Sequence, residues 1–333
     1  MNAEPRLAVS LPIPPDLEAC LETGEWAERQ GFDGLWLADI GSLDAVTLAA
    51  ALACRTSTVR IGLGVVPAYT RTPALLAASV TTLSQLAPGR IVMGLGASSH
   101  AMIEGWHGMA FEKPLTRVKE TAITLRRMLA GEQVAFEGET LRTAGFRMSP
   151  PLKGDVPIYI AALRPKMLEM AGEVGDGVVI NMQPLSAMPR MLKHIAIGAE
   201  RAGKRLSDLE IVCRHSVCVT DDPAAARENF RKRFAPYFAT PVYNKFLAWC
   251  GFPEVAATIA EGWREKNREK TAGAFSDDLI DQLAIIGDAE KCRADIRAFV
   301  QAGVTTPVIN PVNATGGEVR GTLEAFVPAN FGR

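Results

Sequence analysis

Eight short apolar segments, nearly all followed by a helical segment, constrain the fold of this chain more than any other feature. The segments are residues 7–13, 34–38, 59–66, 90–95, 156–161, 177–181, 209–219 and 304–309. Short continuous apolar runs are typical of strands that are buried on both faces of a parallel sheet. Eight strands alternating with helices favour an α/β (β/α)8 TIM barrel, and a doubly wound open sheet is the second possibility.

Two departures from this alternation account for the length of the chain. A TIM barrel needs about 250 residues, whereas this chain has 333. Residues 134–146 alternate between apolar and polar side chains around a glycine, which predicts a hairpin insertion within residues 131–152 after the fourth helix. Residues 222–286 are predicted to form a helical insertion between strands seven and eight. No linker separates two domains, so we expect a single domain over residues 1–333.

Charge and composition exclude several classes of protein. The chain has 36 basic and 37 acidic side chains, which argues against binding to nucleic acid. It begins without a secretory signal, and no apolar run reaches the roughly 20 residues of a membrane span. The six cysteines lack C-x-x-C spacing and the four histidines lack i, i+4 spacing, which argues against a disulfide scaffold or a metal site. We therefore expect a cytoplasmic protein without a metal.

Candidate functional residues follow the predicted strands, because the chemistry of a TIM barrel lies at the carboxyl ends of its strands. Asp39 follows the second strand and is either a general acid or base, or a helix cap or ion-pair partner. His100 and His107 flank Trp106 after the fourth strand and are candidate proton donors or structural residues. Trp36 and Trp106 either stack on a planar cofactor or pack in the core.

Two further segments have chemistry that suits a cofactor. The G-x-G pair that ends at Gly96 either lets a cofactor approach the backbone or makes a tight turn, and Ser99 stands where a dinucleotide motif has its third glycine. Pro165 opens a predicted helix between Arg164 and Lys166. Free N–H groups and positive charge could bind a phosphate there, and a solvated basic helix start is the alternative.

Four longer stretches occur in a characteristic order along the chain. They are GFDGLWLAD at residues 31–39, IGLGVVPAYTRTPALLAAS at 61–79, LAPGRIVMGLGASSHAMIEGWHGMAFEKPLTRVKE at 86–120, and ALRPKMLEMAGEVGDGVVIN, which ends at 181. With them the chain resembles the bacterial luciferase-like superfamily, in particular its coenzyme F420-dependent oxidoreductases and methylenetetrahydromethanopterin reductases. This resemblance implies a (β/α)8 barrel with a deazaflavin or flavin in its mouth.

The resemblance also implies site residues. A bulge with a non-prolyl cis peptide follows strand three in this family and supports the back of the ring, and the matching bond is Gly64–Val65. The phosphate site of the family maps onto the helix start at residues 163–166, and the loop at residues 96–99 lines the polar side of the cofactor. The expected cofactor-binding residues are Trp36, Gly64, Val65, Val66, Gly96, Ala97, Ser98, Ser99, Ala162, Leu163, Arg164 and Lys166.

The chain departs from the family pattern at two positions that handle protons. Related deazaflavin enzymes often carry Asp-His after strand two, where this chain has Asp39 and Ile40. Many also have an acidic residue in the loop after strand four, where this chain has Ser99. The candidate catalytic residues are Asp39, His100, Glu104 and His107.

Three functions follow from the resemblance. The first is an F420-dependent oxidoreductase that transfers a hydride between the deazaflavin and a small organic substrate. The second is an FMN-dependent luciferase-like monooxygenase, and the third is a non-catalytic protein that binds a flavin or deazaflavin. Members of the family are often dimers, so a homodimer is a further expectation.

Overall fold

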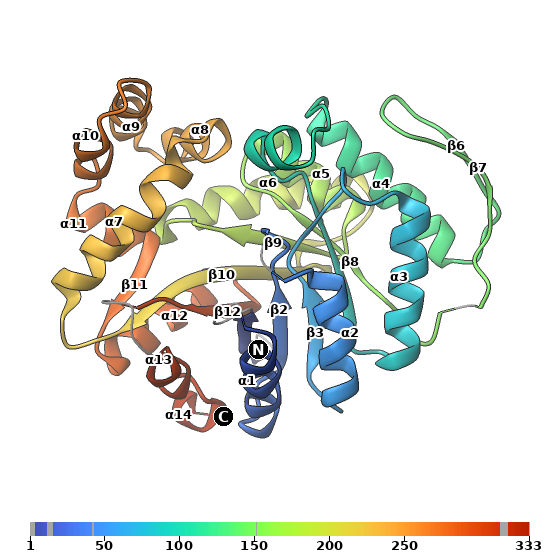
Figure 1. Ribbon diagram of the computed structural model, residues 1–333, viewed down its shortest axis with the longest axis horizontal. Coiled ribbons are helices and arrows are strands. Elements are labelled where there is room, and N and C mark those ends of the chain that lie inside the picture. The colour runs from blue at the N-terminus through green and yellow to red at the C-terminus, as the bar shows by residue number, and fades with distance from the viewer. Residues whose placement is uncertain (1–3, 12–15, 42, 151, 314–318, 333) are drawn as a thin grey trace.

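A closed barrel of eight parallel strands forms the centre of the computed structural model, which describes residues 4–11, 16–41, 43–150, 152–313 and 319–332 (Figure 1). In order around the barrel the strands are β1 (Ala8–Leu11), β2 (Gly34–Leu37), β3 (Arg60–Leu63), β5 (Ile91–Gly96), β8 (Ile158–Ala161), β9 (Gly177–Asn181), β10 (Glu210–Val219) and β12 (Thr306–Pro311). The barrel closes because β10 pairs with β9 and β12 pairs with β1. The predicted TIM barrel is confirmed, and an open sheet is excluded.

Helices cover the outer face of the barrel. They are α1 (Leu17–Arg29), α2 (Ala45–Arg55), α3 (Pro73–Leu86), α4 (Pro114–Leu129), α5 (Pro165–Val174), α6 (Met188–Arg201) and α12 (Ala289–Gln301). The side chains of Asp16, Asp44 and Thr72 accept hydrogen bonds from the first turns of α1, α2 and α3, which satisfies backbone donors that would otherwise lack a partner. Two short 3-10 segments, η2 (Leu185–Ala187) and η3 (Leu206–Asp208), flank α6.

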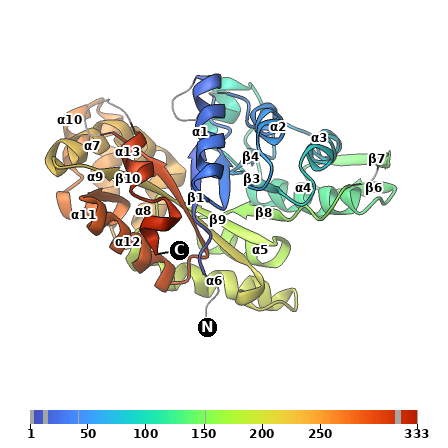
Figure 2. The ribbon, with the colours of Figure 1, turned by 90° about the horizontal axis from the view of Figure 1, so that it is seen from below.

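The two predicted insertions lie on opposite sides of the barrel (Figure 2). The predicted hairpin is confirmed, because β6 (Val134–Glu137) and β7 (Arg142–Phe146) pair antiparallel. On the other side, helices pack around a second hydrophobic cluster, which also includes residues of β10. They are α7 (Pro223–Ala239), α8 (Pro241–Trp249), α9 (Pro253–Arg264), α10 (Arg268–Gly273) and α11 (Asp277–Leu283).

Our prediction of helix throughout residues 222–286 is wrong at its end, where β11 (Ala284–Gly287) forms. The reason is the length of β10, whose last four residues, 216–219, pair in parallel with β11. Two short helices, α13 (Arg320–Glu324) and α14 (Pro328–Phe331), follow β12.

A few predicted features fall outside the described residues: residues 1–3 of the amino terminus, residues 12 and 13 of the first strand, and residue 151 in the first insertion. Among the helices of the described ranges, none is long and apolar enough to cross a membrane.

Side chains fill the interior of the barrel in layers, because alternate residues of each strand point inward. The middle layer is apolar and lies between a charged layer at the amino-terminal end and a polar layer toward the carboxyl-terminal end. Its members are Ala8, Trp36, Val92, Tyr159, Val179, Val212 and Val308. The interior is therefore a packed core that carries the site on its carboxyl-terminal side.

Candidate functional site

A bulge between β3 and β4 (Val66–Pro67) forms one wall of the barrel mouth. The Gly64–Val65 peptide bond in this bulge is cis, which confirms the bond that the family resemblance implied. The Gly64 N–H donates to the carbonyl oxygen of Leu37 in β2 at 2.6 Å. Gly64 and Val65 are partly exposed, whereas Val66 is buried. The bulge therefore presents main chain and the Val65 side chain to the mouth.

Two glycines of β5 make room for this bulge. A Cβ atom on Gly94 would lie 2.0 Å from the carbonyl oxygen of Leu63 and 2.9 Å from Cγ1 of Val65. A Cβ atom on Gly96 would lie 2.6 Å from Cγ2 of Val65. The sequence left open whether this G-x-G pair lets a cofactor approach or makes a turn. The structure shows that both glycines accommodate the bulge from the next strand of the barrel.

Trp36 supports the bulge from inside the barrel. A Cβ atom on Gly62 or Gly64 would lie 2.7 or 2.8 Å from the Trp36 indole, so the ring lies directly against β3. The indole also stacks on Tyr159, with ring centroids 6.0 Å apart, and Trp36 is only 5% exposed. Of the two alternatives for Trp36, stacking on a cofactor or packing in the core, the structure shows core packing.

A charged cluster closes the amino-terminal end of the barrel. Glu210 accepts hydrogen bonds from Tyr159 at 2.7 Å and from Thr306 at 2.5 Å, and it forms ion pairs with Arg60 and Arg6. Burial opposes ionisation of Glu210, but the Arg60 charge and these hydrogen bonds outweigh it and hold the pKa of the carboxyl below its usual range.

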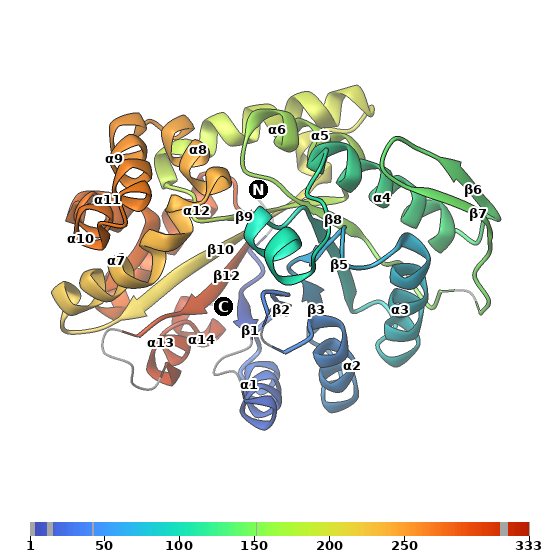
Figure 3. The same cartoon turned by 45° about the horizontal axis from the view of Figure 1, so that its top comes forward.

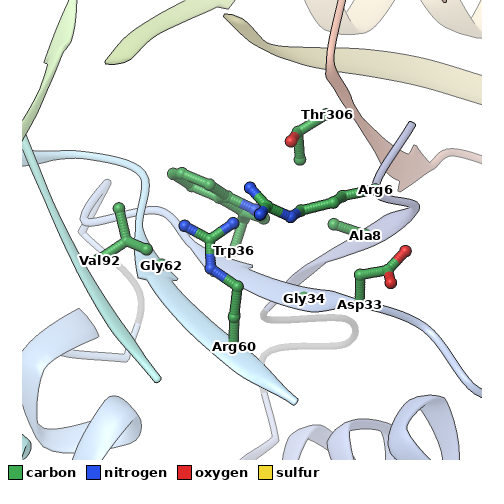
Figure 4. Close-up of a pocket in the computed structure, with 9 residues that line it drawn as sticks. All are labelled: Arg6, Ala8, Asp33, Gly34, Trp36, Arg60, Gly62, Val92 and Thr306. Carbon is green, nitrogen blue, oxygen red and sulfur yellow. The ribbon is translucent and has the colours of Figure 1, made fainter. Parts of the chain in front are cut away.

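This closed end leaves no room for a ligand. Arg6, Arg60 and Thr306 lie around the Trp36 ring in the recess at the amino-terminal end (Figure 4). The recess has no volume that a water molecule could fill. The partly exposed residues of the bulge lie at the other end, where the strands have their carboxyl ends.

Asp39 stands at that end, directly after β2, and forms an ion pair. Its Oδ2 accepts a hydrogen bond from Nη1 of Arg71 at 2.6 Å, and the two side chains are 17% and 15% exposed. Arg71 also pairs with Asp44, the residue that caps α2. The sequence left open whether Asp39 is a general acid or base, or a helix cap or ion-pair partner. The structure shows Asp39 in an ion pair with Arg71. Sequence reasoning missed Arg71, because nothing local in the TRTP segment indicates a partner 32 residues earlier.

The other candidate proton donors lie on or beside η1 (Ala101–Trp106), a π-helical segment over the carboxyl-terminal end of the barrel (Figure 3): Glu104 is within it, and His100 and His107 flank it. Nδ1 of His100 lies 3.5 Å from Oε2 of Glu104, and both side chains are about half exposed. Oε1 of Glu104 accepts from the backbone N–H of Phe111 at 3.2 Å, and His107 is exposed. Within the described ranges, none of the three candidates on this segment makes a polar contact with Asp39.

The loop that connects β5 to η1 contains the remaining residues expected beside a cofactor. Ala97, Ser98 and Ser99 are all partly exposed. Ser98 has a φ of 63°, and its hydroxyl donates to Sδ of Met102 at 3.1 Å. The carbonyl oxygen of Ser99 accepts from the N–H of Ile103 at 2.9 Å. Ser98 and Ser99 therefore make hydrogen bonds to residues of η1 and remain partly exposed.

Exposed apolar side chains surround the same end of the barrel. Ile40 follows β2 and is 43% exposed, and Trp106 and Met109 follow β5 and are 59% and 38% exposed. The Trp106 ring covers Gly41, where a Cβ atom would lie 2.6 Å from the ring and where φ is +81°. The loops after β2 and β5 thus meet through Trp106 and form an apolar rim.

The start of α5 has the features of an anion site. Arg164 is the N-cap residue and makes no side-chain cap, and Pro165 occupies the first turn, so other N–H groups of this turn lack a side-chain partner. Arg164 and Lys166 are exposed, and neither pairs with a carboxylate within the described ranges. Ala162 is buried and Leu163 is partly exposed just before the helix.

A polar group that sequence reasoning largely missed lines the mouth opposite the bulge. It consists of Ser10, Asn181, Arg214 and Asn310. The sequence analysis did not single out Ser10 or Arg214. A signal for Arg214 existed, because it is a charged residue within the apolar run 209–219. In the part of the chain that the structure describes, no group of three or more His, Cys, Asp or Glu side chains is placed to hold a metal ion.

Comparisons with known sequences agree over most of the chain. A family model described as luciferase-like monooxygenase matches residues 3–306. A 5,10-methylenetetrahydromethanopterin reductase of Methanolobus tindarius is 33% identical over 282 residues, which cover 84% of this chain and 86% of that protein. A Mycobacterium tuberculosis protein named as a candidate coenzyme F420-dependent oxidoreductase is 31% identical and is covered to 89%, with 86% of this chain aligned.

Solved structures show the same fold. The coenzyme F420-dependent tetrahydromethanopterin reductase of Methanopyrus kandleri superposes with a TM-score of 0.83 at 24% identity, over 98% of both chains. An F420-dependent secondary alcohol dehydrogenase bound to an F420–acetone adduct superposes with a TM-score of 0.81 at 20% identity, over 98% of this chain and 99% of that one.

Proposed function

Because the chain belongs to the luciferase-like monooxygenase family, we propose that it is an F420-dependent oxidoreductase that transfers a hydride between a deazaflavin and a small organic substrate. The observation that carries this proposal is the bulge at Gly64–Val65, packed against Trp36, Gly94 and Gly96 at the carboxyl-terminal end of the barrel strands. The names of the relatives favour a deazaflavin over FMN.

The residues present fit a deazaflavin. A planar ring needs a surface that it can approach closely, and the bulge offers partly exposed main chain at Gly64 and Val65, with the Trp36 indole packed behind Gly64. A phosphate needs donors and positive charge, and the start of α5 offers N–H groups together with Arg164 and Lys166. Ala97, Ser98 and Ser99 would line the edge of the cofactor between the bulge and the start of α5.

When bound, a deazaflavin supplies a ring carbon that gives or accepts a hydride. The protein's residues then have separate tasks. The bulge holds one face of the ring, and the apolar rim of Ile40, Trp106 and Met109 limits the access of water. Arg71 engages Oδ2 of Asp39 and leaves Oδ1 without a hydrogen-bond partner in the described ranges. Asp39 can therefore hold or accept a proton at Oδ1 beside the mouth.

Direct titration tests the proposal. Purified protein is titrated with coenzyme F420 and with FMN while the change in cofactor fluorescence is followed. We expect saturable binding of F420 and weaker binding of FMN. Saturable binding of FMN alone, with oxygen consumption when reduced FMN is supplied, would replace the proposal with a monooxygenase. A third outcome is that F420 binds but takes part in no reaction. In that case no added alcohol or sugar phosphate reduces the bound F420, and no added enone oxidises its reduced form, which would indicate a carrier.

Replacing the two cations at the start of α5 should weaken F420 binding. In the double variant R164Q/K166Q we expect an increase in Kd of about tenfold at low ionic strength and a smaller increase at 1 M salt, because screening reduces the contribution of exposed charges. Fluorescence titration at both salt concentrations measures the change.

The variant R264Q/R268Q is the matched control, since it removes two exposed cations from the helical insertion. An equal Kd in R164Q/K166Q and in the unmodified protein would rule out a role for the side-chain charges and leave only the backbone N–H groups.

The variant D39N should lower turnover more than cofactor affinity. We expect turnover to fall about 10- to 100-fold, because an amide cannot accept the proton that the carboxylate accepts. We expect the Kd for F420 to change less than about threefold, because the ring is held by the bulge. Steady-state kinetics with whichever added alcohol, sugar phosphate or enone the unmodified protein turns over, together with fluorescence titration, separate the two effects.

D44N is the control for this variant. It removes the other carboxylate partner of Arg71, while asparagine still caps α2. If D44N lowers turnover as much as D39N, the effect of Asp39 comes from holding Arg71 and not from proton transfer.

A further inference from the structure

The carboxyl-terminal half of the barrel contains a guanidinium whose charge is not compensated. Nε of Arg214 in β10 donates to Oγ of Ser10 at 2.9 Å, and Nη2 donates to Oδ1 of Asn310 at 2.7 Å. Both partners are neutral, and no carboxylate pairs with Arg214 within the described ranges. Arginine stays protonated in proteins, so the positive charge persists in this place.

The surroundings of Arg214 make this charge costly unless a ligand neutralises it. Burial lowers the pKa of Arg214, and the hydroxyl groups of Tyr237 and Tyr243 act in the opposite direction. Tyr243 is the partner of Asn181, whose Nδ2 donates to the tyrosine oxygen at 3.3 Å. Arg214 is partly exposed, so an anion can reach it. A charge that is largely withdrawn from water is more favourable when an opposite charge lies beside it, which indicates a site for an anion that arrives from outside.

The position of Arg214 places this anion site opposite the bulge. Around the barrel the strands follow the order β1, β2, β3, β5, β8, β9, β10 and β12, so β3 and β10 are four strands apart in a ring of eight. The side chain of Arg214 crosses the inner face of β12 to reach Ser10 in β1. A ring that lies on the bulge has its other face toward this group.

We propose that Arg214, oriented by Ser10 and Asn310, binds a carboxylate of the substrate and makes the enzyme select carboxylate-bearing compounds. This inference rests on the proposed function, since it takes the cofactor ring to lie on the bulge. Arg214 provides one uncompensated positive charge, which a carboxylate neutralises with its single negative charge. Nη1 has no hydrogen-bond partner within the described ranges, so it leaves a donor for the carboxylate. Arg214 is in this sense a specificity-determining residue.

Benzoate and benzamide provide the test, because they have nearly the same shape and differ in charge. Their binding to the full-length protein is measured by saturation-transfer NMR, with F420 bound and without it. We expect benzoate to bind at least about tenfold more tightly than benzamide, a difference of about 1.4 kcal/mol. The variant R214Q should abolish this preference, and R214K should keep part of it because it keeps the charge.

Control variants separate Arg214 from its surroundings. R205Q removes an exposed arginine that pairs with Asp208 on the surface, and it should leave the preference unchanged. R233Q removes the exposed cation of α7 that acts on Arg214, and it should also leave the preference largely intact. If R214Q does not fold, S10A provides a second test, since it removes one orienting acceptor and should weaken benzoate binding while benzamide binding stays the same.

Three results would overturn the inference. The first is equal binding of benzoate and benzamide by the unmodified protein. The second is loss of the preference in R233Q but not in R214Q. The third is a loss of F420 affinity in R214Q as large as its loss of benzoate affinity, which would make Arg214 a cofactor residue. If F420 fails to bind while the preference for benzoate persists, the proposed function fails and the anion site stands.

Discussion

The variant G94A is expected to lose F420 affinity by at least about tenfold, which corresponds to about 1.4 kcal/mol. The added Cβ would lie 2.0 Å from the carbonyl oxygen of Leu63, so the backbone that leads into the bulge must move. Overpacking of this kind typically costs about 1–3 kcal/mol of folding free energy, so we also expect a lower free energy of unfolding. Fluorescence titration and urea unfolding measure the two effects.

The variant G96A provides a comparison with G94A, because its obstacle is a side chain and not main chain. In G96A the closest contact is Cγ2 of Val65 at 2.6 Å, a side-chain atom, and V65A removes that atom. We therefore expect G96A/V65A to recover part of the affinity that G96A loses. V65A should not rescue G94A, because there the obstacle is main chain. Gly273 has open space around it, so G273A is the control and should bind F420 normally.

If G94A retains normal F420 affinity while its stability falls, the bulge does not support the cofactor. The same conclusion follows if G273A and G94A lose affinity equally, because the loss would then be independent of the bulge.

The variant E210Q is expected to lose about 3 kcal/mol of stability, because it leaves the Arg60 guanidinium beside a neutral amide at the closed end of the barrel. The Glu210 side chain is 9% exposed, and it is the shared acceptor of Tyr159, Thr306 and Arg60. Urea unfolding at pH 7 measures the loss. The variant E132Q breaks an exposed pair with Arg127 and should change stability by less than about 0.5 kcal/mol.

The pH dependence of this stability has a definite sign. The pKa of Glu210 is lower in the folded protein than its ordinary value of 4.5, so the unfolded state binds more protons in this range. The contribution of Glu210 is therefore complete above pH 4.5 and is lost as the pH falls through the lower folded pKa. The difference in stability between the unmodified protein and E210Q should shrink below pH 4.5. A constant difference down to pH 3 would contradict the assignment.

Much of the fold could be predicted from the sequence, because local signals are strong there. The apolar runs and helix starts led to the eight strands of the barrel and to the antiparallel hairpin at residues 134–146. Strand β11 was missed because its four residues directly follow α11 and its partners, residues 216–219 of β10, lie far away in the chain.

The candidate site could be predicted only in part. The family resemblance implied the cis bond at Gly64–Val65, and the basic start of α5 could be read from a single segment. The partner of Asp39 was not found, because Arg71 reaches it from a different loop. The closed end of the barrel was not found either, since Arg6 and Glu210 are 204 residues apart in the chain.

The sequence by itself determined the order of the strands and helices and the family to which the chain belongs. The tertiary structure decided which end of the barrel is open and which side chains of a strand face the site. Arg214 points into the barrel, whereas its neighbour His215 points outward against Phe299, where burial lowers its pKa to about 3. Strands in a parallel barrel are buried on both faces, so apolar residues do not alternate with polar ones. Which face is inside is therefore set by strand register, and only the closed barrel reveals it.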